Sequence, residues 1–185
     1  MPEDVRRAGW AQILDRADRL AAECAHIALQ WNSGQDFPFA TTVEIRPRPG
    51  TVASEWAATL VPAAQRAAYV AFRGRFARKF LTDPATDLPA IETDSGTIYA
   101  AVPQRLPALA PLAELILTDY VNWIRTEDGK LYIAPEQPGR GMSWGYPGGG
   151  PLALAIPLNR LLDDINARHL ATASRIETRP PGWIP

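Results

Sequence analysis

Apolar residues recur every three or four positions over the first thirty residues, and charged residues fall mostly between them. This spacing places the apolar side chains along one face of an α-helix. The pattern therefore predicts a long N-terminal amphipathic helix from Glu3 to Gln30, which Asn32-Ser33-Gly34 would end.

Alternating apolar and polar residues predict strands in three places further along the chain. The segment from Phe37 to Arg46 alternates and is closed by a turn that contains Pro47 and Gly50. The residues 91–99 hold a turn signal between two β-forming runs, and Asp128-Gly129 separates another two. Each of these two arrangements is typical of a hairpin.

Helical spacing returns in three later segments. Ser54 is expected to cap a helix that Pro62 interrupts, and the residues 63–81 follow with an aromatic on every third or fourth position. A further helix is predicted from Leu106 to Trp123, and a last one from Pro151 to His169.

The segment 63–81 also contains five basic residues and no acidic one. The basic residues are Arg66, Arg73, Arg75, Arg78 and Lys79, and the interleaved aromatics are Tyr69, Phe72, Phe76 and Phe80. Such a mixture can bind nucleic acid or a membrane surface. The helical spacing favours a different interpretation, in which the aromatics are core and the basic residues cover the outer face. Nucleic acid stays open as the less favoured partner.

The segment from Gly139 to Pro151 contains six glycines, two prolines, two aromatics and an arginine, and it leads into the last predicted helix. A glycine run before a helix exposes backbone N–H groups at the positive end of the helix dipole, where an anion binds. The expected ligand-binding residues are Arg140, Ser143, Trp144, Tyr146, Gly148, Gly149 and Gly150. Two alternatives stay open: a purely structural turn, and a surface on which a partner protein docks through the aromatics.

The residues from Trp144 to Ala155 carry a family resemblance. They resemble a W-G-Y-x-G-x-G-P-x-x-L-A pattern of small, functionally unassigned proteins from phages, plasmids and bacterial genomes. The resemblance implies a recurring loop and helix and no particular activity. Pro157 departs from the uninterrupted apolar helix expected after that pattern.

No catalytic or metal site is predicted. Gly141 to Gly145 matches G-x-S-x-G, but no apolar strand precedes the match and no helix follows it at once, so Ser143 is not expected to be a nucleophile. The next histidine, His169, lies 26 residues downstream on another element. Two histidines and one cysteine fall short of the ligands that zinc needs. We therefore expect neither a metal nor a cofactor.

Composition adds limits rather than an activity. A chain of 185 residues with 46% hydrophobic and 21% charged residues is ordinary for a globular protein. We expect one domain over 1–176 and an extended, proline-rich tail over 177–185. A net charge of −1 gives no overall attraction to nucleic acid or anionic lipid. The single Cys24 and the lack of an apolar leader after Met1 predict a cytoplasmic protein without a membrane span.

Together these patterns predict an α+β fold with a long N-terminal helix, a small, mainly antiparallel sheet with two hairpins, and a C-terminal helix after the glycine-rich loop. The expected function is a noncatalytic binding or protein-interaction module whose site is that loop. Its expected partner is a protein or an anionic small molecule. The alternative is an enzyme that acts on a phosphorylated or nucleotide-like small molecule at the same loop.

Overall fold

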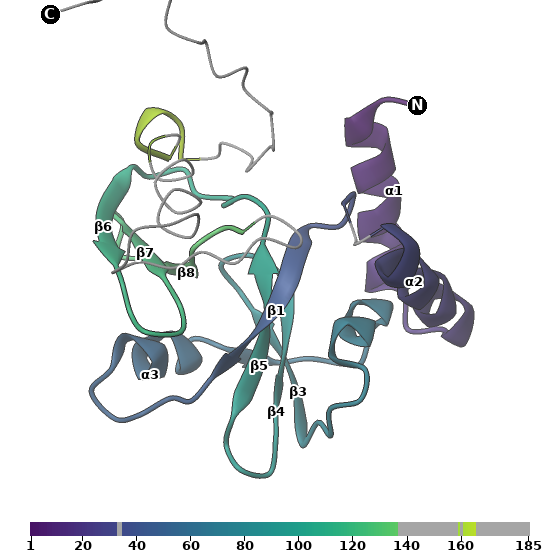
Figure 1. Cartoon of the computed structure of the whole chain (residues 1–185), viewed down its shortest axis with the longest axis horizontal. Coiled ribbons are helices and arrows are strands. Elements are labelled where there is room, and N and C mark those ends of the chain that lie inside the picture. The colour runs from purple at the N-terminus through teal and green to yellow at the C-terminus, as the bar shows by residue number, and fades with distance from the viewer. Residues whose placement is uncertain (33–34, 137–158, 160, 166–185) are drawn as a thin grey trace, which may run out of the picture.

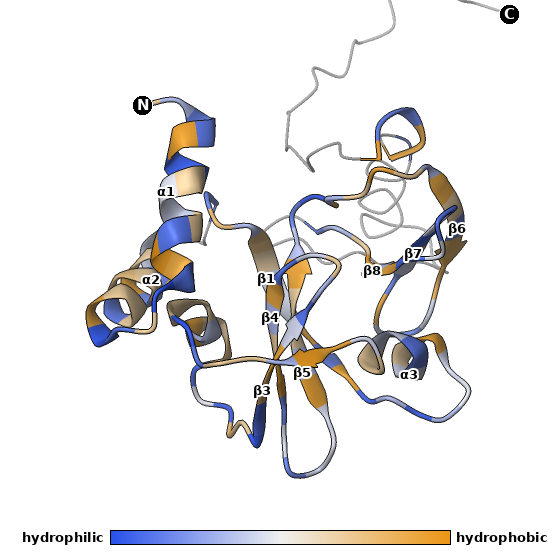
Figure 2. Ribbon diagram, turned by 180° about the vertical axis from the view of Figure 1, so that it is seen from behind, coloured by the Kyte–Doolittle hydropathy of each residue, from blue (hydrophilic) through white to orange (hydrophobic). Residues whose placement is uncertain are grey.

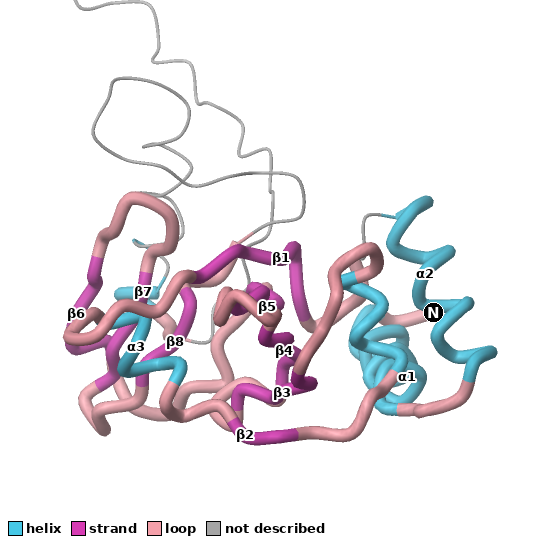
Figure 3. Tube along the Cα trace, turned by 90° about the horizontal axis from the view of Figure 1, so that it is seen from below, coloured by secondary structure: helices cyan, strands magenta, loops and turns pink. Residues whose placement is uncertain are grey.

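The computed structural model describes residues 1–32, 35–136, 159 and 161–165. This part of the chain forms two antiparallel β-sheets and a layer of helices. In Figure 1 the larger sheet stands in the middle, between the N-terminal helices and the smaller sheet. Figure 3 shows the same layers from below. The arrangement confirms the predicted α+β class, with two sheets where we expected one.

The larger sheet contains five strands in the order β1-β5-β4-β3-β2, and each neighbouring pair is antiparallel. The strands are β1 (Phe39–Ile45), β2 (Val61–Pro62), β3 (Lys79–Asp83), β4 (Leu88–Glu92) and β5 (Ile98–Pro103). β1 confirms the strand predicted over Phe37 to Arg46. β4 and β5 confirm the first hairpin, whose turn favours Gly96 because φ there is 77°.

The smaller sheet contains β6 (Leu112–Ile116), β7 (Trp123–Thr126) and β8 (Leu131–Ile133), in that order and antiparallel. The β7–β8 pair confirms the second hairpin, and Gly129 in its turn has a φ of 81°. The helix predicted from Leu106 to Trp123 is wrong. Leu115 pairs with Ile124 across β6 and β7, so this backbone is hydrogen-bonded in a ladder that its helical spacing did not indicate.

The N-terminal region forms two helices where one long helix was expected. They are α1 (Glu3–Asp15) and α2 (Arg19–Asn32). Asp18 starts the second helix, because its Oδ1 accepts a hydrogen bond from the backbone N–H of Ala21 at 3.1 Å. At the break, the carbonyl oxygen of Arg16 accepts a hydrogen bond of 2.6 Å from the N–H of Ala67. The Asp18 cap and the long-range hydrogen bond between Ala67 and Arg16 therefore divide the amphipathic segment into two helices.

The segment 63–81 is not a helix either. It forms a short 3₁₀ helix, η1 (Ala67–Phe72), then a turn at Gly74 with a φ of 88°, and then strand β3. Its aromatics separate accordingly: Tyr69 and Phe72 are buried, whereas Phe76 is 90% exposed. The predicted core stripe is therefore wrong for Phe76, because pairing of β3 with β4 pulls the second half of the segment into the sheet.

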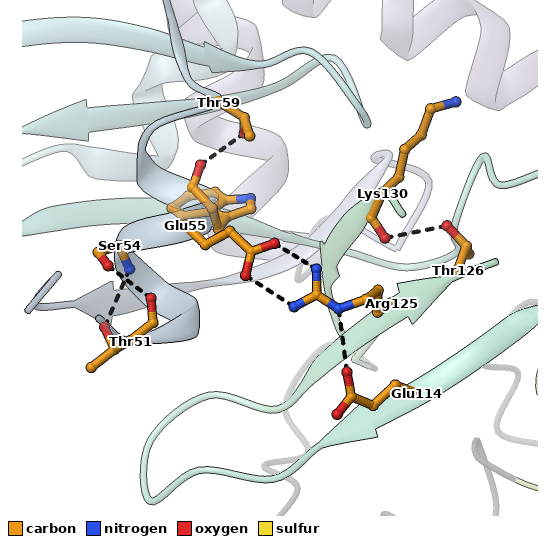
Figure 4. A network of polar contacts seen from close by, with 9 residues as sticks. Thr51, Ser54, Glu55, Thr59, Glu114, Arg125, Thr126 and Lys130 are labelled. Carbon is orange, nitrogen blue, oxygen red and sulfur yellow. Dashed lines mark hydrogen bonds and ion pairs between the residues drawn. The ribbon is translucent and has the colours of Figure 1, made fainter. Parts of the chain in front are cut away.

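The short helix α3 (Val52–Ala57) is capped by Thr51 rather than by Ser54 as predicted. The Thr51 hydroxyl accepts from the N–H of Ser54 at 3.3 Å. Figure 4 shows this cap beside an ion-pair cluster that joins α3 to the smaller sheet. There Arg125 donates two hydrogen bonds to Glu55, at 2.5 and 2.9 Å, and a third to Glu114 at 3.2 Å.

Alternation along β5 divides the interior into two parts. Ile98, Ala100 and Val102 face the smaller sheet, whereas Tyr99 and Ala101 face the helices. Figure 2 shows the hydrophobic colour, orange, along β5. Between the sheets, the rings of Trp56 and Trp123 lie 5.6 Å apart, and each residue is 1% exposed.

A third apolar cluster covers the outer face of the smaller sheet, where Ile124 and Tyr132 pack with Leu161. Of the predicted last helix, residues 159 and 161–163 are helical and 164–165 are not. The rest of that helix lies outside the described residues, as does the tail 177–185. None of the helices in the described part of the chain has both the length and the apolar character needed to cross a membrane.

Candidate functional site

The residues expected to bind a ligand lie outside the described part of the chain. They are Arg140, Ser143, Trp144, Tyr146, Gly148, Gly149 and Gly150. The W-G-Y pattern lies there as well. The loop site and the family resemblance therefore stay predictions, and a site has to be sought among the described residues.

A cleft of about 700 Å³ lies beside α1. We call it the α1 cleft. Its lining comes from α1, from the chain that enters β1, from the turn between β3 and β4, and from the chain that leaves β5. The lining residues include Glu3, Arg7, Phe37, Leu88, Pro103 and Arg105. The volume falls within the range of small-molecule pockets, roughly 300–1,000 Å³.

Aromatic packing holds α1 against the sheet beside this cleft. The ring of Trp10 lies 4.8 Å from that of Phe37, which lies 5.4 Å from the ring of Phe39 at the start of β1. Arg6 adds an ion pair of 3.2 Å with Asp36. These contacts fix one face of the helix, and Arg7, the next residue, lines the cleft.

Gln104 ties the two chain segments on the sheet side of the cleft together. Its backbone N–H donates to the carbonyl oxygen of Pro38 at 3.1 Å. Its side-chain amide donates to the carbonyl oxygens of Phe39, at 3.1 Å, and Gln35, at 3.3 Å. The exit of β5, which carries Arg105, is thereby held against the entry of β1.

Arg7 is the most unusual group of the cleft. Its Nη2 lies 2.6 Å from Oε1 of Glu3, one helical turn earlier, and its side chain is 19% exposed. Despite this short distance, its buried Nε and Nη2 atoms have no hydrogen bond of acceptable geometry within the described residues. Burial lowers the pKa of Arg7, and the nearby Arg105 lowers it further. Arginine stays charged in proteins, so this largely buried cation, although ion-paired with Glu3, still has donor atoms that make no hydrogen bond within the described residues.

Glu136 lies next to the cleft along the backbone. Its N–H donates to the carbonyl oxygen of Pro103, a cleft residue, at 3.0 Å. Burial raises the pKa of the Glu136 carboxyl to about 7. A carboxyl that titrates near neutral pH is a recognised mark of functional sites, although structural burial also produces it.

The five predicted basic residues do not form one basic face. Arg66 is engaged in the fold, since it pairs with Asp15 at 2.8 Å and donates to Thr82 at 3.1 Å. Lys79 pairs with Glu92 at 2.9 Å. The remaining three, Arg73, Arg75 and Arg78, are exposed around Phe76.

The described residues offer little support for a metal site or a catalytic nucleophile. No three histidine, cysteine, aspartate or glutamate side chains gather there in a way that would hold a metal ion. Cys24 is exposed on α2, and the expectation that the protein has no metal or catalytic residue stays a prediction.

Sequence patterns do not identify Arg7, Arg105 and Glu136 as site residues. The helical period places Arg7 on the polar side of the first helix, and nothing in the local pattern brings residue 105 close to it. An arginine between two prolines, as in Pro103-Gln104-Arg105-Leu106-Pro107, was the one available signal, because such a segment is neither helix nor central strand.

Comparisons with protein-family models, with curated proteins and with solved structures gave no match for this chain. The geometry of the α1 cleft is therefore the basis for a functional proposal.

Proposed function

We propose that the protein is a noncatalytic binding module whose α1 cleft takes a small organic acid, that is, a molecule with a carboxylate or phosphate attached to an apolar body. The observation that carries the proposal is the largely buried Arg7 guanidinium near Arg105, two donor atoms of which make no hydrogen bond within the described part of the chain. A fork of two N–H donors is suited to an oxyanion, which it binds with two parallel hydrogen bonds.

Glu3 occupies the place that the ligand's anionic group would take. Its carboxylate lies at ion-pair distance from Arg7 but in poor hydrogen-bond geometry, and its side chain is 45% exposed. Glu3 is the more exposed partner of this pair, so water competes with Arg7 for its carboxylate. A ligand oxyanion in better geometry would displace Glu3 from Arg7, and Arg105 would add a second positive charge.

The apolar lining defines the other end of the ligand. Phe37, Leu88 and Pro103 belong to the cleft wall, so a hydrocarbon or aromatic body would be removed from water there. Such burial contributes about 25 cal/mol for each Å² of apolar surface. An amphipathic acid therefore fits better than a free inorganic ion.

The glycine-rich loop remains part of the proposal. Glu136, bound to Pro103 of the cleft, is the last described residue before the segment that contains Arg140 and Trp144. We propose that this segment contributes further binding residues, in keeping with the site predicted from the sequence. A cytoplasmic location also belongs to the proposal, and its support is the single cysteine, Cys24.

The second candidate is an enzyme that acts on a phosphorylated or nucleotide-like molecule. One observation favours it: the pKa of Glu136, raised to about 7, suits a general acid or base at neutral pH. In that case Glu136→Gln would retain ligand binding and abolish turnover, whereas a pure binding module has no turnover to lose.

The test is a thermal-shift and calorimetric screen of the full chain with benzoate, hexanoate, phenyl phosphate and sugar phosphates. A ligand at about 100 times its Kd stabilises the native state by about 2.7 kcal/mol, which gives a clear rise in Tm. Arg7→Lys keeps the charge but loses the fork and should abolish most of the shift. Arg48→Lys, at an exposed arginine outside the cleft, is the matched control.

Glu3→Gln sharpens the test. It removes the competing carboxylate, so ligand affinity should rise about two- to fivefold, the equivalent of a weak surface ion pair. Binding that is unchanged in Arg7→Lys, or the lack of a shift with every one of these acids, would overturn the proposal.

A further inference from the structure

The loop between η1 and β3 exposes a phenylalanine among arginines. We call residues 73–79 the Arg-Phe loop; it contains Arg73, Arg75, Arg78 and Lys79 and no acidic residue. Phe76 at its centre is 90% exposed, whereas Tyr69 and Phe72, just before it, are each 5% exposed. Phe76 thus contributes nothing to the core, although the same run of aromatics supplies two core residues.

The positive charge of the loop is largely uncompensated. Lys79 pairs with Glu92, but Arg73, Arg75 and Arg78 form no ion pair with an acid in the described part of the chain. Arg75 also interacts electrostatically with Glu44, but that carboxylate is already paired with Arg46 and accepts a hydrogen bond from Tyr99. Three guanidinium groups are therefore available to bind phosphates.

Arg75 forms a stacked pair that extends the aromatic surface. Its guanidinium lies 4.4 Å from the centre of the Tyr99 ring, on the adjoining face of the sheet. The turn at Gly74, with a φ of 88°, directs the chain out of the protein just before Arg75 and Phe76. Flat groups of this kind are what unstacked bases bind to.

A groove with both polar and apolar walls adjoins the loop at Arg73. It has a volume of about 420 Å³ and runs between α2, η1 and strand β1. Besides Arg73, its polar lining includes His26, Gln30, Thr41 and Thr42. These side chains offer hydrogen-bond donors and acceptors of the kind that read base edges or sugar hydroxyls.

We propose that the Arg-Phe loop and this groove bind single-stranded nucleic acid. Phosphates would pair with the arginines, one base would stack on Phe76, and the neighbouring nucleotide would enter the groove. A membrane surface is the weaker interpretation, because a single exposed phenylalanine inserts little apolar surface into a bilayer. A duplex is also disfavoured, since its bases are already stacked.

The test is fluorescence anisotropy with a labelled oligo-uridine and an oligo-thymidine of about 12 nucleotides, and with a duplex of equal length. The full chain should bind the single strands more tightly than the duplex. Its affinity should fall with salt, with a slope of about −0.7 for each phosphate contacted. Three contacts predict a slope near −2 between about 50 and 200 mM salt.

Variants separate stacking from charge. Phe76→Ala should weaken single-strand binding about tenfold at every salt concentration, since the loss of one stacking contact does not release ions. Arg73→Ala/Arg78→Ala should reduce the salt slope by about 1.4. The matched controls are Tyr120→Ala, an aromatic that is 87% exposed elsewhere, and Arg48→Ala.

Three results would overturn the inference. One is equal binding of the single strands by Phe76→Ala and by the Tyr120→Ala control. Another is tighter binding of the duplex than of the single strands. The third is Phe76-dependent binding to phosphatidylglycerol vesicles with no binding to oligonucleotides, which would assign the loop to membranes. All of these variants alter exposed side chains, so we expect them to fold as the wild type does. An unchanged Tm verifies this.

Discussion

The interior between the two sheets and the α1 cleft are both lined mainly by apolar side chains, but they differ in whether their charged groups are hydrogen-bonded. Between the sheets, aliphatic side chains surround Trp56 and Trp123, and the one nearby buried carboxylate, Asp83, accepts three hydrogen bonds. In the cleft, Arg7 has two buried donor atoms that no described residue satisfies with a hydrogen bond. Stability alone does not account for such an arginine, because a satisfied or apolar group would serve the fold better. This difference fits a first region that holds the fold together, and it supports our proposal that the second region binds a ligand.

The largest expected effect concerns the region between the sheets. Trp56→Ala should lower the free energy of unfolding by about 3–5 kcal/mol, as the loss of a large buried ring does. Chemical denaturation followed by circular dichroism measures it, with Trp56→Phe as the control that keeps a ring. A loss below about 1 kcal/mol would show that this interior is not the main source of stability.

The next effect concerns Glu136, at the edge of the cleft. Because its pKa is raised to about 7 in the folded state, the folded protein binds this proton more tightly than the unfolded chain does. Stability from this group is therefore highest at low pH and falls as the pH rises through 4.5 to about 7. Glu136→Gln removes that fall, so the variant should exceed the wild type by about 1–3 kcal/mol near pH 8 and match it near pH 4.

Urea unfolding at several pH values measures this difference. Burial raises the pKa of Asp83 as well, so the wild type has a background slope of the same sign, and only the difference between variant and wild type isolates Glu136. Glu127→Gln, at an exposed position, is the control. If the difference in free energy of unfolding between Glu136→Gln and the wild type does not change with pH, Glu136 is not the source of the pH dependence.

The smallest effect is expected at the surface link between α3 and the smaller sheet. Glu55 accepts two hydrogen bonds from Arg125, which lower the pKa of Glu55. The pair is exposed, so Glu55→Gln should cost only about 0.2–1 kcal/mol, and less at high salt. A double-mutant cycle with Arg125→Ala measures the coupling. A coupling well above this range would mean that the link, and not only the apolar interior, holds the sheets together.

The sequence predicted those elements whose signals are local. Alternation marked β1, and glycine turns marked the hairpins at Gly96 and Gly129, because these signals depend on neighbours in the chain. The segments 63–81 and 106–123 have helical spacing but form β3 and β6, since their pairing with β4 and β7 is a tertiary effect. Asp18 was a readable helix cap that the long amphipathic pattern concealed.

The candidate site was harder to predict than the fold. Arg7 and Arg105 lie almost a hundred residues apart in the chain, and their proximity depends on how α1 packs against the exit of β5. Composition and helical period assign Arg7 to a solvated face. Only the packed structure shows that its guanidinium is largely buried and that two of its donor atoms make no hydrogen bond to any residue the structure describes.

The variant Arg7→Met tests whether Arg7 serves binding rather than folding. Methionine fills a similar volume without a charge, so we expect an unchanged or higher free energy of unfolding, by up to about 1–2 kcal/mol, together with loss of organic-acid binding by calorimetry. A variant that is destabilised by about 3 kcal/mol or more, or that binds the acids as the wild type does, would contradict the claim.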